Sequence, residues 1–259
     1  MIARCLFLFF CSTLWAQTSL QVSPKSSVDL KASDFYGVDN FNALYFSVGN
    51  KIVKTKTDGS SINYSNVQLG ALGTADVFNP LKIAVFYDQF NTVIILDNRL
   101  AEIFKIDFNT IQPYKNVSFV STGFDNTIWL FNQDLQQLEL YDYKSNKTRA
   151  TTIPVGSEVL DVDSDYNHCW LLTENYLYQY NYFGSLVSKT KNDGFQTLRI
   201  NDENVFLKKG NQLFYKPENS EEIMPIQLPE LLINRFLVTN ETLYIYDLEK
   251  LRTFQLKIN

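Results

Sequence analysis

Hydrophobic residues occur along this chain in short runs, and each run is bounded by a polar turn that often contains asparagine. Short runs rich in aromatic and β-branched residues are typical of β-strands. Helical periodicity is almost absent: the stretch 220–233 is the best place for a short helical turn, and its two prolines would interrupt it. The pattern therefore predicts an all-β protein.

A unit of turn, apolar strand, turn and second strand recurs six times. The two best-matched copies are Asn126-Thr-Ile-Trp-Leu-Phe-Asn with Leu138-Glu-Leu-Tyr-Asp, and Asn167-His-Cys-Trp-Leu-Leu with Tyr176-Leu-Tyr-Gln-Tyr. The other copies start at positions 42, 91, 203 and 240, and the mean spacing of the six turn markers is about 40 residues. Propeller blades have this length.

The segments around Trp129 and Trp170 resemble the blades of NHL, WD40-like and regulator-type β-propellers. The resemblance implies an all-β, single propeller of six blades. Six such units fill residues 17–259 without a linker, which predicts one domain. The last unit lacks an outer strand, which residues 19–28 could supply by pairing the N- and C-terminal strands. A β-sandwich and an up-and-down barrel remain alternatives, because regularly spaced short strands also fit those folds.

Residues 1–16 are typical of a signal peptide: Arg4 precedes an apolar run that ends before the small residue Ala16. The run is too short for a membrane span, so we expect an exported chain, cleaved after Ala16, with no transmembrane span in the mature part. That part retains one cysteine, Cys169, which lies in an apolar run and is expected to be a buried structural thiol.

The composition argues against nucleic acid as a partner. The formal net charge is −5, and the densest basic positions are Lys54, Lys56 and the pair Lys208–Lys209. Binding to phosphates needs a basic face, which these few residues do not make. Lys54 and Lys56 would share one face of a strand, which we expect to be solvated.

Catalytic and cofactor signals are weak. The single histidine, His168, has no evident Ser or Cys partner, and one cysteine beside one histidine cannot make a closed zinc site. No glycine-rich phosphate loop occurs, so no cofactor is expected. The densest acidic run places Asp161, Asp163 and Asp165 alternately along an expected innermost strand and its turn. They are candidate ligands of a metal site that is not an EF-hand loop. The competing interpretation is a polar turn between strands.

Four tyrosines, Tyr176, Tyr178, Tyr180 and Tyr182, alternate along one predicted strand and so share one face of its sheet. Such a row either packs between adjacent blades or forms an interaction surface for a protein or a glycan.

These observations favour binding over catalysis. The signal that ends in Trp15-Ala16-Gln17 and the mature sequence, rich in Asn, Tyr, Phe and Lys, resemble exported envelope proteins of the Bacteroidetes. We therefore expect a non-enzymatic propeller that is periplasmic or associated with the outer membrane. Its partners would be proteins, as in a subunit of an outer-membrane assembly or secretion complex. The alternatives are a metal-dependent propeller hydrolase or lyase that uses the Asp161 run, and a carbohydrate-binding propeller.

Overall fold

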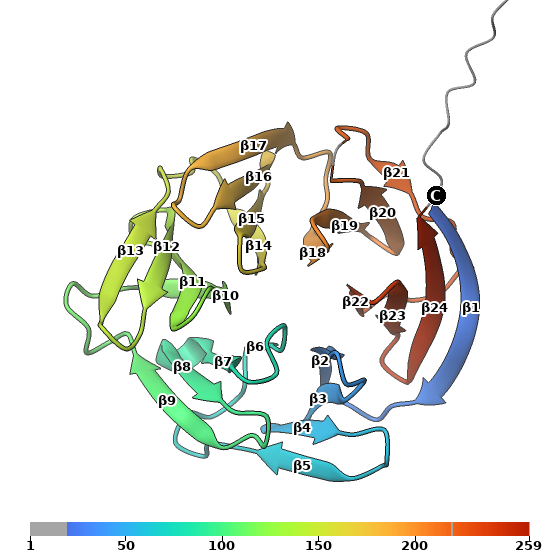
Figure 1. The fold of residues 1–259 in the computed structure, drawn as a ribbon, viewed down its shortest axis with the longest axis horizontal. Helices are drawn as coiled ribbons and strands as arrows, with labels where there is room; N and C mark the ends of the chain where they lie inside the picture. The colour runs from blue at the N-terminus through green and yellow to red at the C-terminus, as the bar shows by residue number, and fades with distance from the viewer. Residues whose placement is uncertain (1–19, 219, 259) are drawn as a thin grey trace, which may run out of the picture.

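The computed structural model describes residues 20–218 and 220–258, and the predicted signal peptide lies outside the described residues. The described chain forms six four-stranded antiparallel sheets, arranged as blades around a central axis (Figure 1). The prediction of an all-β, six-bladed propeller is therefore confirmed.

Within each blade, the strand next to the axis is given first below. Blade 1 contains β2 (Asp34–Val38), β3 (Leu44–Val48), β4 (Lys51–Thr55) and β5 (Ser61–Tyr64), and blade 2 contains β6 (Thr74–Asp76), β7 (Ile83–Tyr87), β8 (Thr92–Leu96) and β9 (Glu102–Asp107). Blade 3 contains β10 (Val117–Thr122), β11 (Thr127–Asn132), β12 (Gln137–Asp142) and β13 (Lys147–Thr151), and blade 4 contains β14 (Val159–Ser164), β15 (His168–Thr173), β16 (Tyr176–Asn181) and β17 (Leu186–Lys191). Blade 5 contains β18 (Thr197–Asn201), β19 (Asn204–Lys209), β20 (Gln212–Lys216) and β21 (Met224–Pro225), and blade 6 contains β22 (Arg235–Thr239), β23 (Thr242–Tyr246), β24 (Lys250–Ile258) and β1 (Leu20–Asp29).

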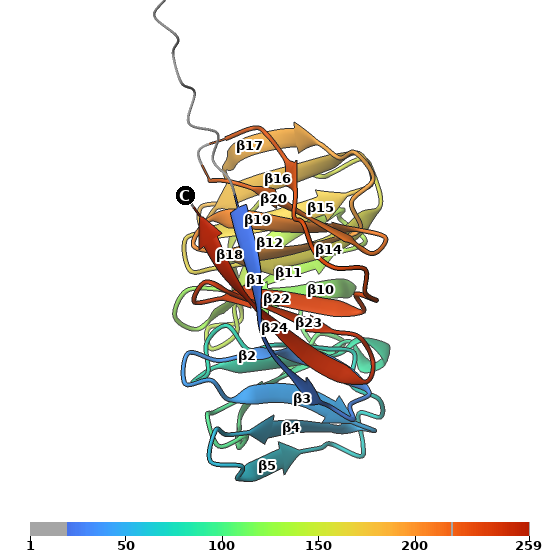
Figure 2. The same cartoon turned by 90° about the vertical axis from the view of Figure 1, so that its right-hand side faces the viewer.

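The ring is closed by the two ends of the described chain. β1 pairs antiparallel with β24 from Leu20 opposite Ile258 to Asp29 opposite Lys250, with one register shift between Pro24 and Ser26 (Figure 2). The hydroxyls of Ser26 and Thr253, 227 residues apart in sequence, lie 2.6 Å from each other. The predicted closure by terminal strands is confirmed, and it covers the outer edge of β24.

The hydrophobic core lies between the blades. Every residue of β7, β8 and β11 is buried, because both faces of these strands are covered by neighbouring blades. Trp129 and Phe131 of blade 3 pack in one cluster with Tyr178 and Tyr180 of blade 4. This explains why the strands read as continuous apolar runs rather than as alternating ones.

One repeat marker is out of phase. Asn91 has a left-handed backbone (φ 47°) and lies between β7 and β8, after the 3-10 turn η1 (Asp88–Phe90), whereas the other markers lie between the first and second strands of their blades. The first turn of blade 2 is the connection 77–82. The spacing between the first two markers is therefore uneven because the blade 2 marker precedes the third strand of its blade, whereas the other markers precede the second strand. The stretch 220–233 holds β21 and irregular connections instead of a helical turn.

Candidate functional site

The six innermost strands surround a central channel with a cavity of about 450 Å³. Contacts between β14 and β18 show that these two innermost strands run in the same direction. Asp161 and Asp163 of β14 accept hydrogen bonds from the backbone N–H groups of Leu198 and Ile200 of β18, and each pair is separated by 37 residues in sequence. The turns that follow the innermost strands therefore lie on one face of the propeller, here called the turn face.

Arginine–carboxylate pairs join neighbouring blades in the channel wall. Arg199 of β18 donates to Asp161 of β14 at 2.9 Å. Arg235 of β22 donates two hydrogen bonds to Asp34 of β2, at 2.8 and 2.7 Å. These charge-assisted contacts, of which the Arg235–Asp34 contact is bidentate, offset part of the hydration that the charged groups lose on folding.

Asp76 of β6 makes a comparable link without an arginine. Its carboxylate accepts from the hydroxyl of Ser121 at 3.0 Å and from the backbone N–H of Thr122 at 2.7 Å, both on β10. Ser164 of β14 approaches Ser121 from the other side, with 2.8 Å between the hydroxyl oxygens. These polar groups bind innermost strands to one another, and their hydrogen-bonding capacity is used in holding the ring.

Asp163 has the chemistry of a potential proton acceptor. Burial raises its pKa from 3.8 to about 7, although the nearby Arg199 opposes the shift. A carboxyl group with a pKa near neutrality can exchange a proton at physiological pH.

The predicted metal candidates are only partly brought together. Asp161 and Asp163 lie on β14 and both contact β18. Asp165 lies in the following turn, where its carboxylate accepts from the backbone N–H groups of Asn167 and His168, each at 2.7 Å. Within residues 20–218 and 220–258, no group of three His, Cys, Asp or Glu residues is arranged to hold a metal ion.

The predicted tyrosine row divides into buried and exposed parts. Tyr178 and Tyr180 are buried against blade 3, with their rings stacked at a centroid distance of 5.9 Å. Tyr176 and Tyr182 are exposed, and the Lys189 ammonium lies 3.8 Å from the Tyr176 ring centroid. The two central tyrosines follow the packing interpretation, so the row is not one continuous binding face.

His168 and Cys169 begin strand β15. His168 Nδ1 lies 3.7 Å from a carboxylate oxygen of Glu203 in the first turn of blade 5. Cys169 is fully buried, and burial raises the pKa of its thiol well above the ordinary value. A buried neutral thiol is a poor nucleophile, so Cys169 is a packing residue, as expected.

An aromatic cluster on the turn face was not predicted from the sequence. It consists of Phe78, Phe124 and Tyr166, one residue from the first turn of blades 2, 3 and 4, and is called the aromatic trio here. The Tyr166 ring lies 5.1 Å from that of Phe78 and 6.4 Å from that of Phe124, in edge-to-face geometry. Phe41, in the first turn of blade 1, is also exposed. The missed signal is an aromatic residue placed in the turn that follows an innermost strand.

Hydrogen bonds hold the three turns of the aromatic trio in place. Asp76, which joins β6 to β10, also accepts from the backbone N–H of Phe78 at 2.9 Å. Lys82 of blade 2 is buried. Its ammonium donates to the carbonyls of Gly123 and Asp125 in the next turn, at 2.5 and 2.9 Å, and to that of Thr127 at the start of β11, at 3.0 Å. Burial lowers the pKa of Lys82 to about 8. The trio is thus built on fixed backbone.

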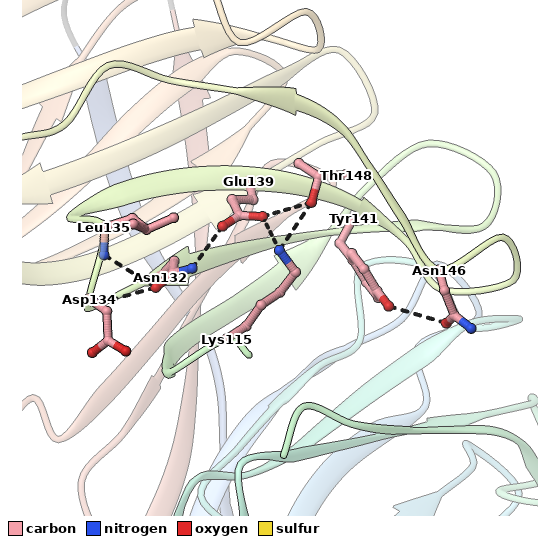
Figure 3. Close-up of polar contacts among 8 residues, drawn as sticks. All are labelled: Lys115, Asn132, Asp134, Leu135, Glu139, Tyr141, Asn146 and Thr148. Atoms are coloured by element: carbon pink, nitrogen blue, oxygen red, sulfur yellow. Dashed lines mark hydrogen bonds and ion pairs between the residues drawn. The ribbon is translucent and has the colours of Figure 1, made fainter. Parts of the chain in front are cut away.

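In two buried lysine–carboxylate pairs, the lysine and the carboxylate belong to the same blade. In blade 3, Lys115 donates to Glu139, which also accepts from Asn132 at 2.8 Å and Thr148 at 2.7 Å (Figure 3). Burial alone would raise the pKa of Glu139, but these donors hold it below its ordinary value. Because every charged group is satisfied, the cluster is structural.

In blade 1, Lys54 pairs with Asp39 at 3.2 Å. The expectation that Lys54 lies on a solvated face is therefore wrong: its side chain is buried, because Asp39 and the carbonyl of Asn98 take up its ammonium group. Lys56 is exposed, as expected.

No protein-family model matches the chain, and no curated protein matches its sequence. Solved structures do resemble it. A catalytically inactive virginiamycin B lyase from Staphylococcus aureus with quinupristin superposes with a TM-score of 0.62 at 12% identity, over 92% of this chain and 100% of that one. A chain of a mitotic checkpoint complex gives 0.62 at 11%, over 98% and 99%, and the Neurospora crassa Pan2 WD40 domain gives 0.58 at 10%, over 86% and 74%.

These similarities show a β-propeller fold, as the resemblance to WD40-like blades implied. The neighbours include both an enzyme and a WD40 domain, so the fold alone does not decide the activity. Among the described residues, no helix is long and apolar enough to cross a membrane.

Proposed function

We propose that this protein is an exported, non-enzymatic propeller that acts as a protein-interaction platform in the cell envelope, as a subunit of an outer-membrane assembly or secretion complex. The signal-like residues 1–16 support export. The proposal places the mature chain in the periplasm or at the outer membrane.

The observation that carries the proposal is the contrast between the channel and the turn face. Inside the channel, Asp34, Asp76 and Asp161 are each used to hold a neighbouring strand. On the turn face, large aromatic side chains stand exposed on rigid turns: Phe41 is 71% exposed and Phe124 56%. Exposed aromatic clusters are typical of binding surfaces rather than of reaction centres.

The test is a native pull-down of the tagged chain from gently solubilised envelopes, followed by mass spectrometry. Reproducible co-purification with outer-membrane or secretion subunits would support the proposal and name the partner. Recovery of the protein alone, from cells in which it is expressed at its natural level, would contradict it.

A second candidate, a propeller hydrolase or lyase, is favoured by Asp163, whose pKa of about 7 suits a general base. Because a virginiamycin B lyase with quinupristin is among the structures of similar fold, quinupristin is the first compound to try. Incubation with quinupristin, with and without EDTA, would show turnover by a change in mass. Turnover that Asp163→Asn abolishes would establish this candidate in place of the platform.

A carbohydrate-binding propeller is less well supported by the tyrosine row, since two of its four members are buried.

A further inference from the structure

The aromatic trio lies at one end of the channel. Phe78 belongs to the channel wall, and it contacts Tyr166 from a blade that is not its neighbour. The trio therefore reaches across the rim instead of lying within one blade. Phe78, Phe124 and Tyr166 are 49%, 56% and 39% exposed, so each ring keeps a substantial area open to solvent.

The turns around the aromatic trio carry acidic groups and lack exposed basic ones. The six first turns are residues 39–43, 77–82, 123–126, 165–167, 202–203 and 240–241. Asp125, Asp202 and Glu241 are exposed there, and Asp165 and Glu203 are partly exposed. All residues of these turns are described, and their one lysine or arginine is Lys82, whose ammonium is enclosed by carbonyl groups. Aromatic faces and carboxylates on one surface both attract cations.

The surface is also preorganised. The Phe78 turn is fixed by Asp76, the Phe124 turn by Lys82, and the Tyr166 turn by Asp165. A surface whose backbone is already ordered loses little conformational entropy when a ligand binds. Protein–protein interfaces commonly have aromatic anchors at the centre and a polar rim around them.

From these observations we infer that the turn face binds a cationic segment of a partner protein, with a lysine or arginine side chain placed against the aromatic trio and further basic residues near Asp125 and Asp202. This inference rests on the proposed role as an interaction platform and specifies the face and the chemistry of the partner. Arginine suits the site better than lysine, because its guanidinium can stack on an aromatic face while it donates to a carboxylate.

The test uses the chain from residue 17 to 259 and two fluorescent peptides, one of alternating glycine and arginine and one of alternating glycine and glutamate. Fluorescence anisotropy at low and high salt would measure the affinity. We expect the arginine peptide to bind and the glutamate peptide not to bind, and high salt should weaken the binding of the arginine peptide. Phe124→Ala combined with Tyr166→Ala should weaken it about tenfold, and Asp125→Asn with Asp202→Asn several-fold.

Matched controls come from other turns. Phe90→Ala removes an aromatic side chain of similar exposure from the turn between β7 and β8, and Glu249→Gln removes an acidic one from the turn between β23 and β24. Neither should change the affinity. Thermal unfolding of every variant shows whether the fold is kept, and Phe78→Ala provides an independent trio variant. The inference is overturned if the arginine peptide does not bind, or if it binds the trio variants as well as the wild type.

The other outcomes separate this inference from the proposed function. If envelope pull-downs recover the same partner with the wild type and with the trio variants, the platform stands and the turn-face inference fails. If the arginine peptide binds through the trio while the pull-downs recover no partner, the inference stands and the envelope role fails. Trio-dependent binding of the polysaccharide laminarin without peptide binding would replace the inference with a glycan site.

Discussion

At the residue scale, the ion pairs of the channel wall and of the blade 3 cluster represent two kinds of charged contact. One kind joins neighbouring blades, as Arg199 does with Asp161 and Arg235 does with Asp34. The other closes clusters inside a blade, as Lys115 does with Glu139. In both kinds a charge is held beside a partner that offsets its loss of water. Asp163 differs, because it accepts from a backbone N–H and its burial penalises the ionised form.

The first prediction concerns the pH dependence that Asp163 imposes. Its folded-state pKa of about 7 lies above 3.8, so folding favours the protonated form. The resulting stabilisation is complete below about pH 4 and is lost as the pH rises through 7. Asp163→Asn lacks this dependence, so relative to wild type it should gain roughly 1–4 kcal/mol of stability between pH 4 and pH 8. Urea unfolding at several pH values measures the effect.

The control for this prediction is Asp134→Asn, which changes an exposed aspartate in the turn between β11 and β12. A stability difference between Asp163→Asn and wild type that stays constant from pH 4 to pH 8 would show that Asp163 is not held in its protonated form.

The second prediction concerns the blade 3 cluster. Lys115→Met leaves the Glu139 carboxylate buried without its cation, and unfolding free energy should fall by about 3–5 kcal/mol. Adding Glu139→Gln removes the unpaired charge and should restore part of that loss. Denaturant unfolding of both variants, with the exposed Lys189→Met as reference, checks the expectation. If Lys115→Met is as stable as the Lys189→Met reference, the Lys115–Glu139 pair contributes nothing to the free energy of unfolding.

Prediction of single residues from the sequence succeeded where the position of a residue along its strand determines its place in the blade. Asp161 and Asp163 were expected on an innermost strand and lie on β14. Prediction failed where a residue elsewhere in the sequence determines whether a side chain is buried. Lys54 is buried because its ammonium group pairs with the carboxylate of Asp39, fifteen residues earlier. The aromatic trio was missed for the same reason, since Phe78 and Tyr166 meet only when blades 2 and 4 are placed around the axis.

At the scale of the elements, the blades are held by strand pairing within each sheet and by apolar packing between sheets. The strand runs were predicted well, because continuous apolar segments such as β11 are specified by their own residues. The phase of the repeat in blade 2 was not, because β8 has the same turn–strand appearance as the second strands of other blades. A pattern of this kind marks a strand and does not say which strand of the blade it is.

The third prediction tests the terminal strand. Removing residues 17–29 exposes the outer edge of β24, so the shortened chain should unfold at lower temperature and associate through that edge. A synthetic peptide of residues 20–29 should restore the monomer and part of the thermal stability, and a scrambled peptide should not. Size-exclusion chromatography and thermal scans measure both effects. A shortened chain that remains monomeric with unchanged stability would refute a closing role for β1.

At the scale of the whole molecule, six similar blades give a ring with two different zones. The carboxylates of the channel wall are hydrogen-bonded to neighbouring blades, whereas aromatic side chains of the turn face are exposed to solvent. The number of blades could be predicted from the spacing of the turns, because the ring needs one repeat for each blade. The functional face could not, because it is formed by turns that are separated by about 40 residues along the sequence and meet only around the axis.

The pairing of β1 with β24 also delays ring closure until the end of the chain has been synthesised. Ser26 is synthesised 227 residues before its partner Thr253. A ribosome that adds about 5–20 residues per second takes roughly 10–50 s to cover that distance. During this interval β1 has no partner strand, and an unfinished ring presents bare strand edges to proteases and to other nascent chains. Chaperone occupancy and proteolytic loss should therefore be higher before β24 is available to pair with β1 than after the ring has closed.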